Sequence, residues 1–246
     1  MEVVRGGVTG WDLTNELKRT LLAHGAALVG IADMTAVPGC AHPRGVSVAV
    51  PLPPSLVRDL QTAPTLAYHE QYHTLNRRLD GLVSLAERIL QEAGHRAYAQ
   101  TTDRVTVDAD RCSPLPHKTV ATRAGLGWIG KSGLLVTSTF GSAVRLSSLL
   151  TDAPLTPDAP TERSRCEKCA LCVTHCPAQA IHGATWSPGM ARAELVDVER
   201  CYETQCAIMY AQTGLREDLC GKCSAVCAYT RGYLKRSADE GAPSPA

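Results

Sequence analysis

The sequence predicts an α/β domain over residues 1–160, a small cysteine-rich α+β domain over residues 161–236, and a flexible tail over residues 237–246. Three observations lead to this prediction. In the first part, helical apolar spacing alternates with short apolar runs typical of strands. Nine of the eleven cysteines lie between residues 166 and 227. A proline-rich polar stretch at residues 151–160 separates the two parts, as is typical of a boundary between domains.

The elements of the first part follow from its apolar pattern. A first helix ends at Gly25 and is predicted by Leu13, Leu17, Leu21 and Leu22. Short apolar runs predict buried strands at residues 26–32 and 46–50. A long helix ends at Gly94, and its apolar face consists of Leu75, Leu79, Leu82, Val83, Ala86, Ile89 and Leu90. Arg104–Asp108 alternates like a third strand, so the order of elements predicts a layered α/β domain.

Charge and composition make several classes of protein less well supported, although nucleic-acid binding is not excluded. The 25 basic side chains are balanced by 24 acidic ones, so no basic surface typical of nucleic-acid binding is indicated. No segment approaches the roughly 20 apolar residues of a membrane helix, and we expect no membrane partner. The N-terminus lacks the pattern of a secretory signal. We therefore expect a cytoplasmic protein whose thiols are reduced.

The first cysteine run indicates an iron–sulfur site. Cys166, Cys169, Cys172 and Cys176 have the spacing C-x2-C-x2-C-x3-C and precede Pro177. This is the bacterial ferredoxin pattern for a [4Fe–4S] cluster, in which the fourth cysteine binds the neighbouring cluster. A zinc site, the alternative, typically has two C-x-x-C pairs with a longer gap between them.

A second run, Cys220-x2-Cys223-x3-Cys227, supplies three more cysteines. The ligand that is still missing would be Cys201, with Cys206 as the alternative. Crossed ligation, as in two-cluster ferredoxins, predicts two ligand sets. The first set is Cys166, Cys169, Cys172 and Cys227, and the second is Cys176, Cys201, Cys220 and Cys223. We expect the remaining cysteines to be small buried apolar side chains, namely Cys40, Cys112 and Cys206.

The segment Gly125–Ser132 matches the P-loop pattern G-x4-G-K-S and also G-x-G-x-x-G. Both motifs require a strand before the glycines and a helix after them. Here residues 117–124 predict a helix before the glycines and residues 133–139 a strand after them. An ATPase with a ferredoxin insert is therefore only a minor alternative.

Four motifs in order resemble epoxyqueuosine reductase and, more distantly, the corrinoid-dependent reductive dehalogenases. They are residues 123–135, residues 140–146, residues 151–155, and the Cys166 run with residues 177–181. The resemblance extends over roughly residues 10–235 and is dense only from 112 to 181. Upstream, Tyr72, His73 and the long helix are similar to the helix before the catalytic strand in that family.

The resemblance implies a nitroreductase-like α/β domain that holds base-off cobalamin, followed by a ferredoxin-like domain with two [4Fe–4S] clusters. It further implies reductive removal of oxygen or halide through Co(I). An external donor of the flavodoxin or ferredoxin type would supply electrons, and tRNA is a candidate substrate. Lys131 would contact the corrin or a leaving anion. The candidate cofactor-binding residues are Tyr72, His73, Gly125, Gly127, Trp128, Gly130 and Lys131.

Departures from the family pattern concern the proton donor and the substrate. Aligned on Pro114 and Lys118, the family's proton-donating aspartate corresponds to Arg111, and Asp110 lies one position away. Asp110 is therefore the candidate catalytic acid, with His117 in place of the family's glutamate. No helical-repeat domain follows the cysteines and the charge is balanced, so tRNA is a weaker expectation than the resemblance alone suggests.

Two further interpretations come from other functional classes. The chain could be an electron-transfer protein that reduces a corrinoid on another protein, or a two-cluster ferredoxin with a degenerate first domain. His69 and His73 have the i, i+4 spacing of a zinc pair on a helix, but no acidic third ligand follows in the HExxH manner. We therefore expect His73 at the corrin pocket or on a solvated helix surface.

Overall fold

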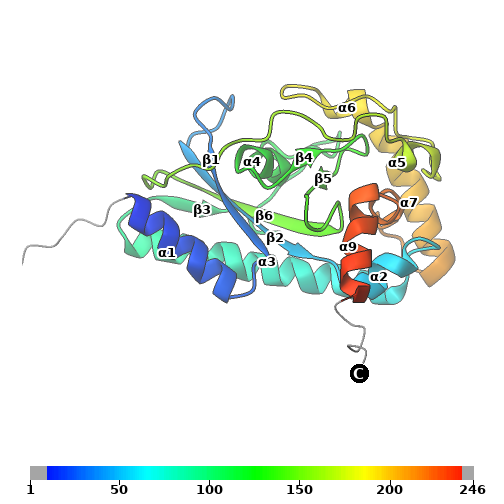
Figure 1. The fold of residues 1–246 in the computed structure, drawn as a ribbon, viewed down its shortest axis with the longest axis horizontal. Helices are drawn as coiled ribbons and strands as arrows, with labels where there is room; N and C mark the ends of the chain where they lie inside the picture. Colours follow the sequence, from blue (N-terminus) through cyan, green and yellow to red (C-terminus); the bar gives the residue numbers. More distant parts are fainter. Residues whose placement is uncertain (1–9, 240–246) are drawn as a thin grey trace, which may run out of the picture.

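A four-stranded antiparallel sheet forms the centre of the computed structural model, which describes residues 10–239 (Figure 1). The strand order is β1-β2-β6-β3. The strands are β1 (Leu28–Asp33), β2 (Arg44–Pro51), β3 (Ala97–Ala99) and β6 (Val144–Thr151). Val46 faces Ile31 on one side and Leu149 on the other, and all three side chains are fully buried. The buried strands predicted at residues 26–32 and 46–50 are confirmed.

Helices cover both faces of this sheet (Figure 1). α1 (Gly10–Ala23) and α3 (Leu66–Glu92) pack on one face, and α4 (His117–Arg123) packs on the other. The Thr65 hydroxyl caps α3 by accepting a 3.1 Å hydrogen bond from the Tyr68 amide. The predicted apolar face of α3 is buried in the main core, with Leu79 and Leu90 at 1% and 0% exposure. The long helix is therefore confirmed.

Residues 104–108 form no strand, so that prediction is wrong. The amides of Arg104 and Val105 both donate to the Thr101 carbonyl at 3.0 Å, which makes a turn. Val107 is 63% exposed, so the alternation has no core to face. The edge of the sheet is formed by β3 instead, where Ala99 pairs with Leu149.

The proline-rich stretch at residues 151–160 is anchored to the first part of the chain. Ala153 and Leu155 are buried in the main core. The Asp158 carboxylate accepts hydrogen bonds of 2.7 Å from the Ile31 amide and from the Lys18 ammonium. Met209 and Leu234 belong to the same core. The boundary at residue 160 stays a prediction, and the core extends across it.

The second part of the chain consists of short helices and loops. Its helices are α5 (Leu171–Thr174), α6 (Arg192–Leu195), α7 (Val198–Thr213), α8 (Lys222–Ala225) and α9 (Ala228–Asp239). α8 and α9 contact α2 (Pro54–Asp59), so this part packs against the end of the sheet layer (Figure 1). Between α4 and β6 lies a small hairpin, β4 (Trp128–Ile129) and β5 (Leu135–Val136).

Two predictions concern the ends of the chain. The flexible tail predicted from residue 237 is wrong for residues 237–239, because α9 continues to Asp239. Residues 240–246 lie outside the described residues, and so do residues 1–9, where the sequence predicts no secretory signal. Between residues 10 and 239, no helix is both long and apolar enough to cross a membrane.

Candidate functional site

Cysteines from both runs meet where α5 packs against α8. Cys166, Cys169 and Cys172 line one cleft together with Cys227. The pKa of Cys172 is raised to about 11, mainly by burial and then by the thiols of Cys166, Cys227 and Cys169. Cys172 and Cys227 are far apart in sequence, so the fold brings together the first predicted ligand set.

A second group beside the first consists of Cys176, Cys201, Cys220 and Cys223. Burial raises the pKa of Cys201 to about 11, and the nearest thiols contributing to that rise are Cys176 and Cys220. The pKa of Cys223 is raised by burial and then by Cys220, Cys201, Cys172 and Cys176. Cys223 also lines the first cleft, so it lies where the two groups meet.

The chemistry of this donor set fits bound metal. All eight thiols are free, and burial raises the pKa of four of them, which makes these four costly to ionise: Cys172, Cys201, Cys220 and Cys223. Bound metal cations reverse this cost, because a coordinating thiol is deprotonated outright. Eight thiols in two groups of four match the number of ligands that two [4Fe–4S] clusters require.

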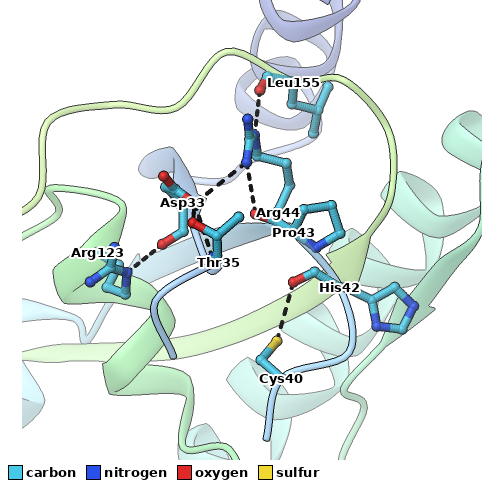
Figure 2. A network of polar contacts seen from close by, with 8 residues as sticks. All are labelled: Asp33, Thr35, Cys40, His42, Pro43, Arg44, Arg123 and Leu155. Carbon is cyan, nitrogen blue, oxygen red and sulfur yellow. Dashed lines mark hydrogen bonds and ion pairs between the residues drawn. The ribbon is translucent and has the colours of Figure 1, made fainter. Parts of the chain in front are cut away.

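The other three cysteines lie outside these groups. Cys206 is 2% exposed within α7, as expected for a small buried side chain. Cys40 and Cys112 are only partly buried, contrary to expectation. The Cys40 thiol donates to the His42 carbonyl at 3.3 Å, in a loop that Figure 2 shows. The Cys112 thiol lies 3.6 Å from the Asp110 carbonyl oxygen.

Lys131 joins the glycine segment to the first cysteine run. Its side chain is buried and lines the same cleft as the first thiol group. The ammonium donates a 2.9 Å hydrogen bond to the Glu167 carbonyl, which lies between Cys166 and Cys169. Its side chain therefore connects the glycine segment to the loop between Cys166 and Cys169.

The glycine segment has the structural context that the sequence indicated. α4 precedes it and the β4–β5 hairpin follows, so the P-loop hypothesis is wrong. A Cβ at Gly127 would lie 2.1 Å from the Val136 carbonyl oxygen. A Cβ at Gly130 would lie 2.8 Å from the Val136 side chain and 3.6 Å from the Cys166 sulfur. Gly125 has a φ of +71°, and there a Cβ would lie 2.5 Å from the Ala159 carbonyl oxygen. These glycines allow close packing within the chain.

Trp128 packs beneath the thiol group. It is 1% exposed and makes an edge-to-face contact with Tyr229, whose ring centroid is 4.8 Å away. The Arg165 guanidinium lies 5.3 Å from the centre of the indole. The indole Nε1 is buried and has no hydrogen-bond partner among the described residues. A buried donor without a partner is costly, so this nitrogen is a candidate contact for a bound group.

A cavity of about 450 Å³ lies on the other side of the hairpin. Ile129 faces it, next to Gly130, which faces the thiol cleft. The wall of the 450 Å³ cavity is partly apolar and includes Trp186, Met190 and Leu195. The volume is in the range of pockets that hold organic ligands or cofactors. The hairpin therefore separates a cofactor-sized cavity from the thiols.

Three cations line this cavity, and each donates to a backbone carbonyl. Lys118 donates to Gly133 at 2.8 Å, Arg192 donates to Arg111 at 2.9 Å, and Arg123 donates to Asp33 (Figure 2). Burial, followed by repulsion from Arg192, lowers the pKa of Lys118 to about 8. One carboxylate, Glu162, also lines the cavity. The excess of positive charge favours an anionic group on the ligand.

The loop that carries Asp110 lies against α7. Asp110 is exposed, whereas the neighbouring Arg111 has a left-handed φ of 57°. The Arg111 guanidinium lies 3.2 Å from the centre of the Tyr202 ring and 3.7 Å from the Glu199 carboxylate. Arg111 thus packs against α7 while Asp110 faces solvent. The role of Asp110 as the catalytic acid stays a prediction.

Tyr72 and His73 line neither the cavity nor the thiol cleft. The Arg145 guanidinium lies 4.0 Å from the centre of the Tyr72 ring. The His73 Nε2 atom faces His69 and Glu217. Glu217 therefore lies close to this histidine pair, although no acidic residue follows the pair in the HExxH manner.

His117 is partly buried beside the cavity-lining Lys118 and does not itself line the cavity. The His117 Nδ1 atom lies 2.8 Å from the Ser148 hydroxyl. Burial, followed by repulsion from Arg145, lowers the pKa of His117 to about 4, so the ring is neutral at pH 7. No sequence motif marks Trp186, Met190 or Arg192, which lie in the loop before α6 and at the first residue of that helix.

Comparison with known proteins gives one consistent result. No family model matches the chain. Epoxyqueuosine reductase from Vibrio cholerae is 34% identical over 173 residues, which cover 67% of this chain and 42% of that protein. The chain thus spans less than half the length of that curated relative.

Solved structures share the fold. Epoxyqueuosine reductase with a modified tRNA-Tyr stem loop has a TM-score of 0.62 at 19% identity, and the match covers 92% of this chain and 67% of that one. A catabolic reductive dehalogenase has a TM-score of 0.73 at 17% identity, over 97% of this chain and 35% of that one. The predicted family resemblance is confirmed: the chain is a homologue of the epoxyqueuosine reductases.

Proposed function

We propose that this protein is an iron–sulfur oxidoreductase with two [4Fe–4S] clusters bound by crossed ligation. The observation that supports this most strongly is the arrangement of the eight thiols in two groups of four. Each group takes ligands from both cysteine runs, as in two-cluster ferredoxins. Cys201 completes the second group, because Cys206 is buried in α7 and does not contribute to it.

We also propose that the cavity beside the hairpin holds part of a cobalamin. Trp186, Met190 and Ile129 would contact its apolar surface. Lys118 and Arg192 would face its anionic group, the phosphodiester. When bound, cobalamin would supply a cobalt centre that, once reduced by electrons from the clusters, has the strongly nucleophilic Co(I) state.

In this proposal, a nitroreductase-like α/β part carries the cofactor and a ferredoxin-like part carries the clusters. The β4–β5 hairpin forms the shared wall, since Ile129 lines the cavity and Gly130 and Lys131 line the thiol cleft. Lys131 holds the loop of the first cluster through the Glu167 carbonyl. Cys169 is exposed, so this edge is accessible to an electron donor of the flavodoxin or ferredoxin type in a reducing compartment.

The substrate would undergo reductive loss of oxygen or halide. Asp110 is the candidate proton donor, and its exposed loop would have to approach the bound substrate. A tRNA substrate is supported by the relative that was solved with a tRNA stem loop. The balanced charge of this chain, 25 basic and 24 acidic side chains, does not add to that support.

The test is retention of hydroxocobalamin by the cluster-loaded protein through anaerobic gel filtration. We expect about one cobalt per chain, consistent with one cofactor-sized cavity. Thr119→Trp places a large side chain in the cavity wall and should abolish retention without changing the iron content. Thr62→Trp, at an exposed turn, is the matched control and should retain cobalt. Full iron with no cobalt in the unaltered protein would favour the alternative, an electron-transfer protein without its own corrinoid.

A further inference from the structure

Outside the thiol groups, two histidines and a glutamate converge at one point. The His69 and His73 Nε2 atoms lie 3.2 Å apart. The Glu217 carboxylate approaches both, with one oxygen 2.9 Å from the His69 nitrogen and the other 3.4 Å from the His73 nitrogen. The two imidazole rings meet edge-on, with an interplanar angle of 70°. All three side chains are partly buried.

These three contacts cannot all be hydrogen bonds. A neutral imidazole donates from one nitrogen and accepts at the other, and a carboxylate only accepts. If both Nε2 atoms carry hydrogens for Glu217, the His69–His73 contact brings two donors together. If His73 donates to His69 instead, the His69 lone pair faces a carboxylate oxygen at 2.9 Å. A cation between the three groups makes every contact favourable.

The spacing also fits a specific ion. Zinc binds histidine nitrogen and carboxylate oxygen at about 2.0–2.2 Å, so neighbouring ligands of a tetrahedral site are about 3.3–3.5 Å apart. The observed separations of 2.9, 3.2 and 3.4 Å are close to these edges. Two histidines and one glutamate are a known zinc ligand set, and a water molecule takes the fourth position.

We propose that His69, His73 and Glu217 form a mononuclear zinc site. The histidines are one turn apart on α3, and Glu217 lies in the loop after α7, three residues before Cys220. A bound zinc would therefore fasten the long helix of the α/β part to the loop that delivers a cysteine of the second thiol group. The site lies outside both the cavity and the thiol cleft, so its zinc would be separate from the proposed cobalamin and clusters.

Equilibrium dialysis of the cluster-loaded protein against Zn²⁺, followed by elemental analysis of zinc and iron, tests the site. We expect about one zinc per chain with unchanged iron. Glu217→Gln and His73→Gln should each weaken zinc binding by about tenfold or more, since each removes a ligand. Glu70→Gln is the matched control: it lies on the same helix beside His69, is exposed, and should bind zinc like the unaltered protein.

Zinc K-edge absorption distinguishes this site from zinc bound by thiols. We expect only nitrogen and oxygen neighbours near about 2.0–2.1 Å, and no sulfur neighbour at about 2.3 Å. Absence of bound zinc, a sulfur neighbour, or equal binding by the Glu217→Gln and Glu70→Gln variants would overturn the proposal. Iron is counted separately, so this outcome is independent of the proposed clusters and cobalamin.

Discussion

The buried ammonium of Lys131 donates a 2.9 Å hydrogen bond to the backbone carbonyl of Glu167. Glu167 has a left-handed φ of 40° and lies directly after Cys166. Non-glycine residues adopt this conformation at a cost, so the loop depends on contacts that hold it. Lys131 therefore both fixes the loop of the first thiol group and brings a positive charge to it.

Replacement of Lys131 by methionine should lower the reduction potential of the cluster in the first thiol group. Loss of a nearby positive charge disfavours the added electron, and we expect a shift on the order of tens of millivolts. A redox titration followed by electron paramagnetic resonance measures it. Lys168→Met removes a charge of the same loop that is exposed to solvent and should cause a much smaller shift. Equal shifts in the two variants would contradict the role given to Lys131.

Crossed ligation predicts that neighbouring cysteines serve different clusters. Cys172→Ser and Cys176→Ser should each leave about four irons, but the surviving cluster should differ in its spectrum and potential. Cys227→Ser should behave like Cys172→Ser, because crossed ligation assigns both residues to the first ligand set. Cys206→Ala is the control and should keep both clusters. The assignment fails if the Cys172 and Cys176 variants retain the same cluster.

His117 should make the protein less stable in acid. Its pKa is lowered to about 4 by burial in the folded protein, against about 6.5 in the unfolded chain. Between these values the unfolded chain binds the extra proton, so stability falls as pH falls from about 6.5 to about 4. From pH 7 to pH 5 this contribution is about 2 kcal/mol.

The measurement is the pH dependence of denaturant unfolding for the unaltered protein and for His117→Gln. The variant should lose less stability on acidification. His24→Gln replaces an exposed histidine and should retain the steeper dependence. Parallel curves for the unaltered protein and the His117 variant would show that this ring is not the titrating group.

Gly127 should not tolerate a side chain. A Cβ at this position would lie 2.1 Å from the Val136 carbonyl oxygen, so Gly127→Ala should open the hairpin and reduce both iron content and the thermal midpoint. Gly81→Ala has nothing within 4 Å of its new Cβ and lies inside α3. It should stabilise the protein by about 0.5–1 kcal/mol. Unchanged iron and thermal midpoint for Gly127→Ala would contradict the packing described for the hairpin.

Local patterns predicted much of this fold. The leucine spacing of α1 and α3 and the apolar runs of β1 and β2 are signals within a few residues, and the structure confirms them. The segment Arg104–Asp108 carries the same alternation but forms a loop, because β3 takes the edge of the sheet beside β6. Strand pairing is a long-range choice, and propensity does not decide it.

The candidate site was likewise predictable where its signal is local in the sequence and not where it depends on long-range contacts. Cysteine spacing predicts two ligand sets, because the short loops around a [4Fe–4S] cluster constrain the sequence spacing of its cysteines. The cavity wall at Trp186 and Met190 lacked such a signal. Glu217 was also missed as a partner of His69, since 148 positions separate the two residues and only the fold brings them together.

The most direct test of the account is the iron and acid-labile sulfide content of protein purified and reconstituted without oxygen. Two clusters predict about eight irons and eight sulfides per chain, with two electron paramagnetic resonance signals on reduction. Zinc held by the thiols, or no more than about four irons after full reconstitution, would contradict the paired-cluster arrangement on which the proposed electron path depends.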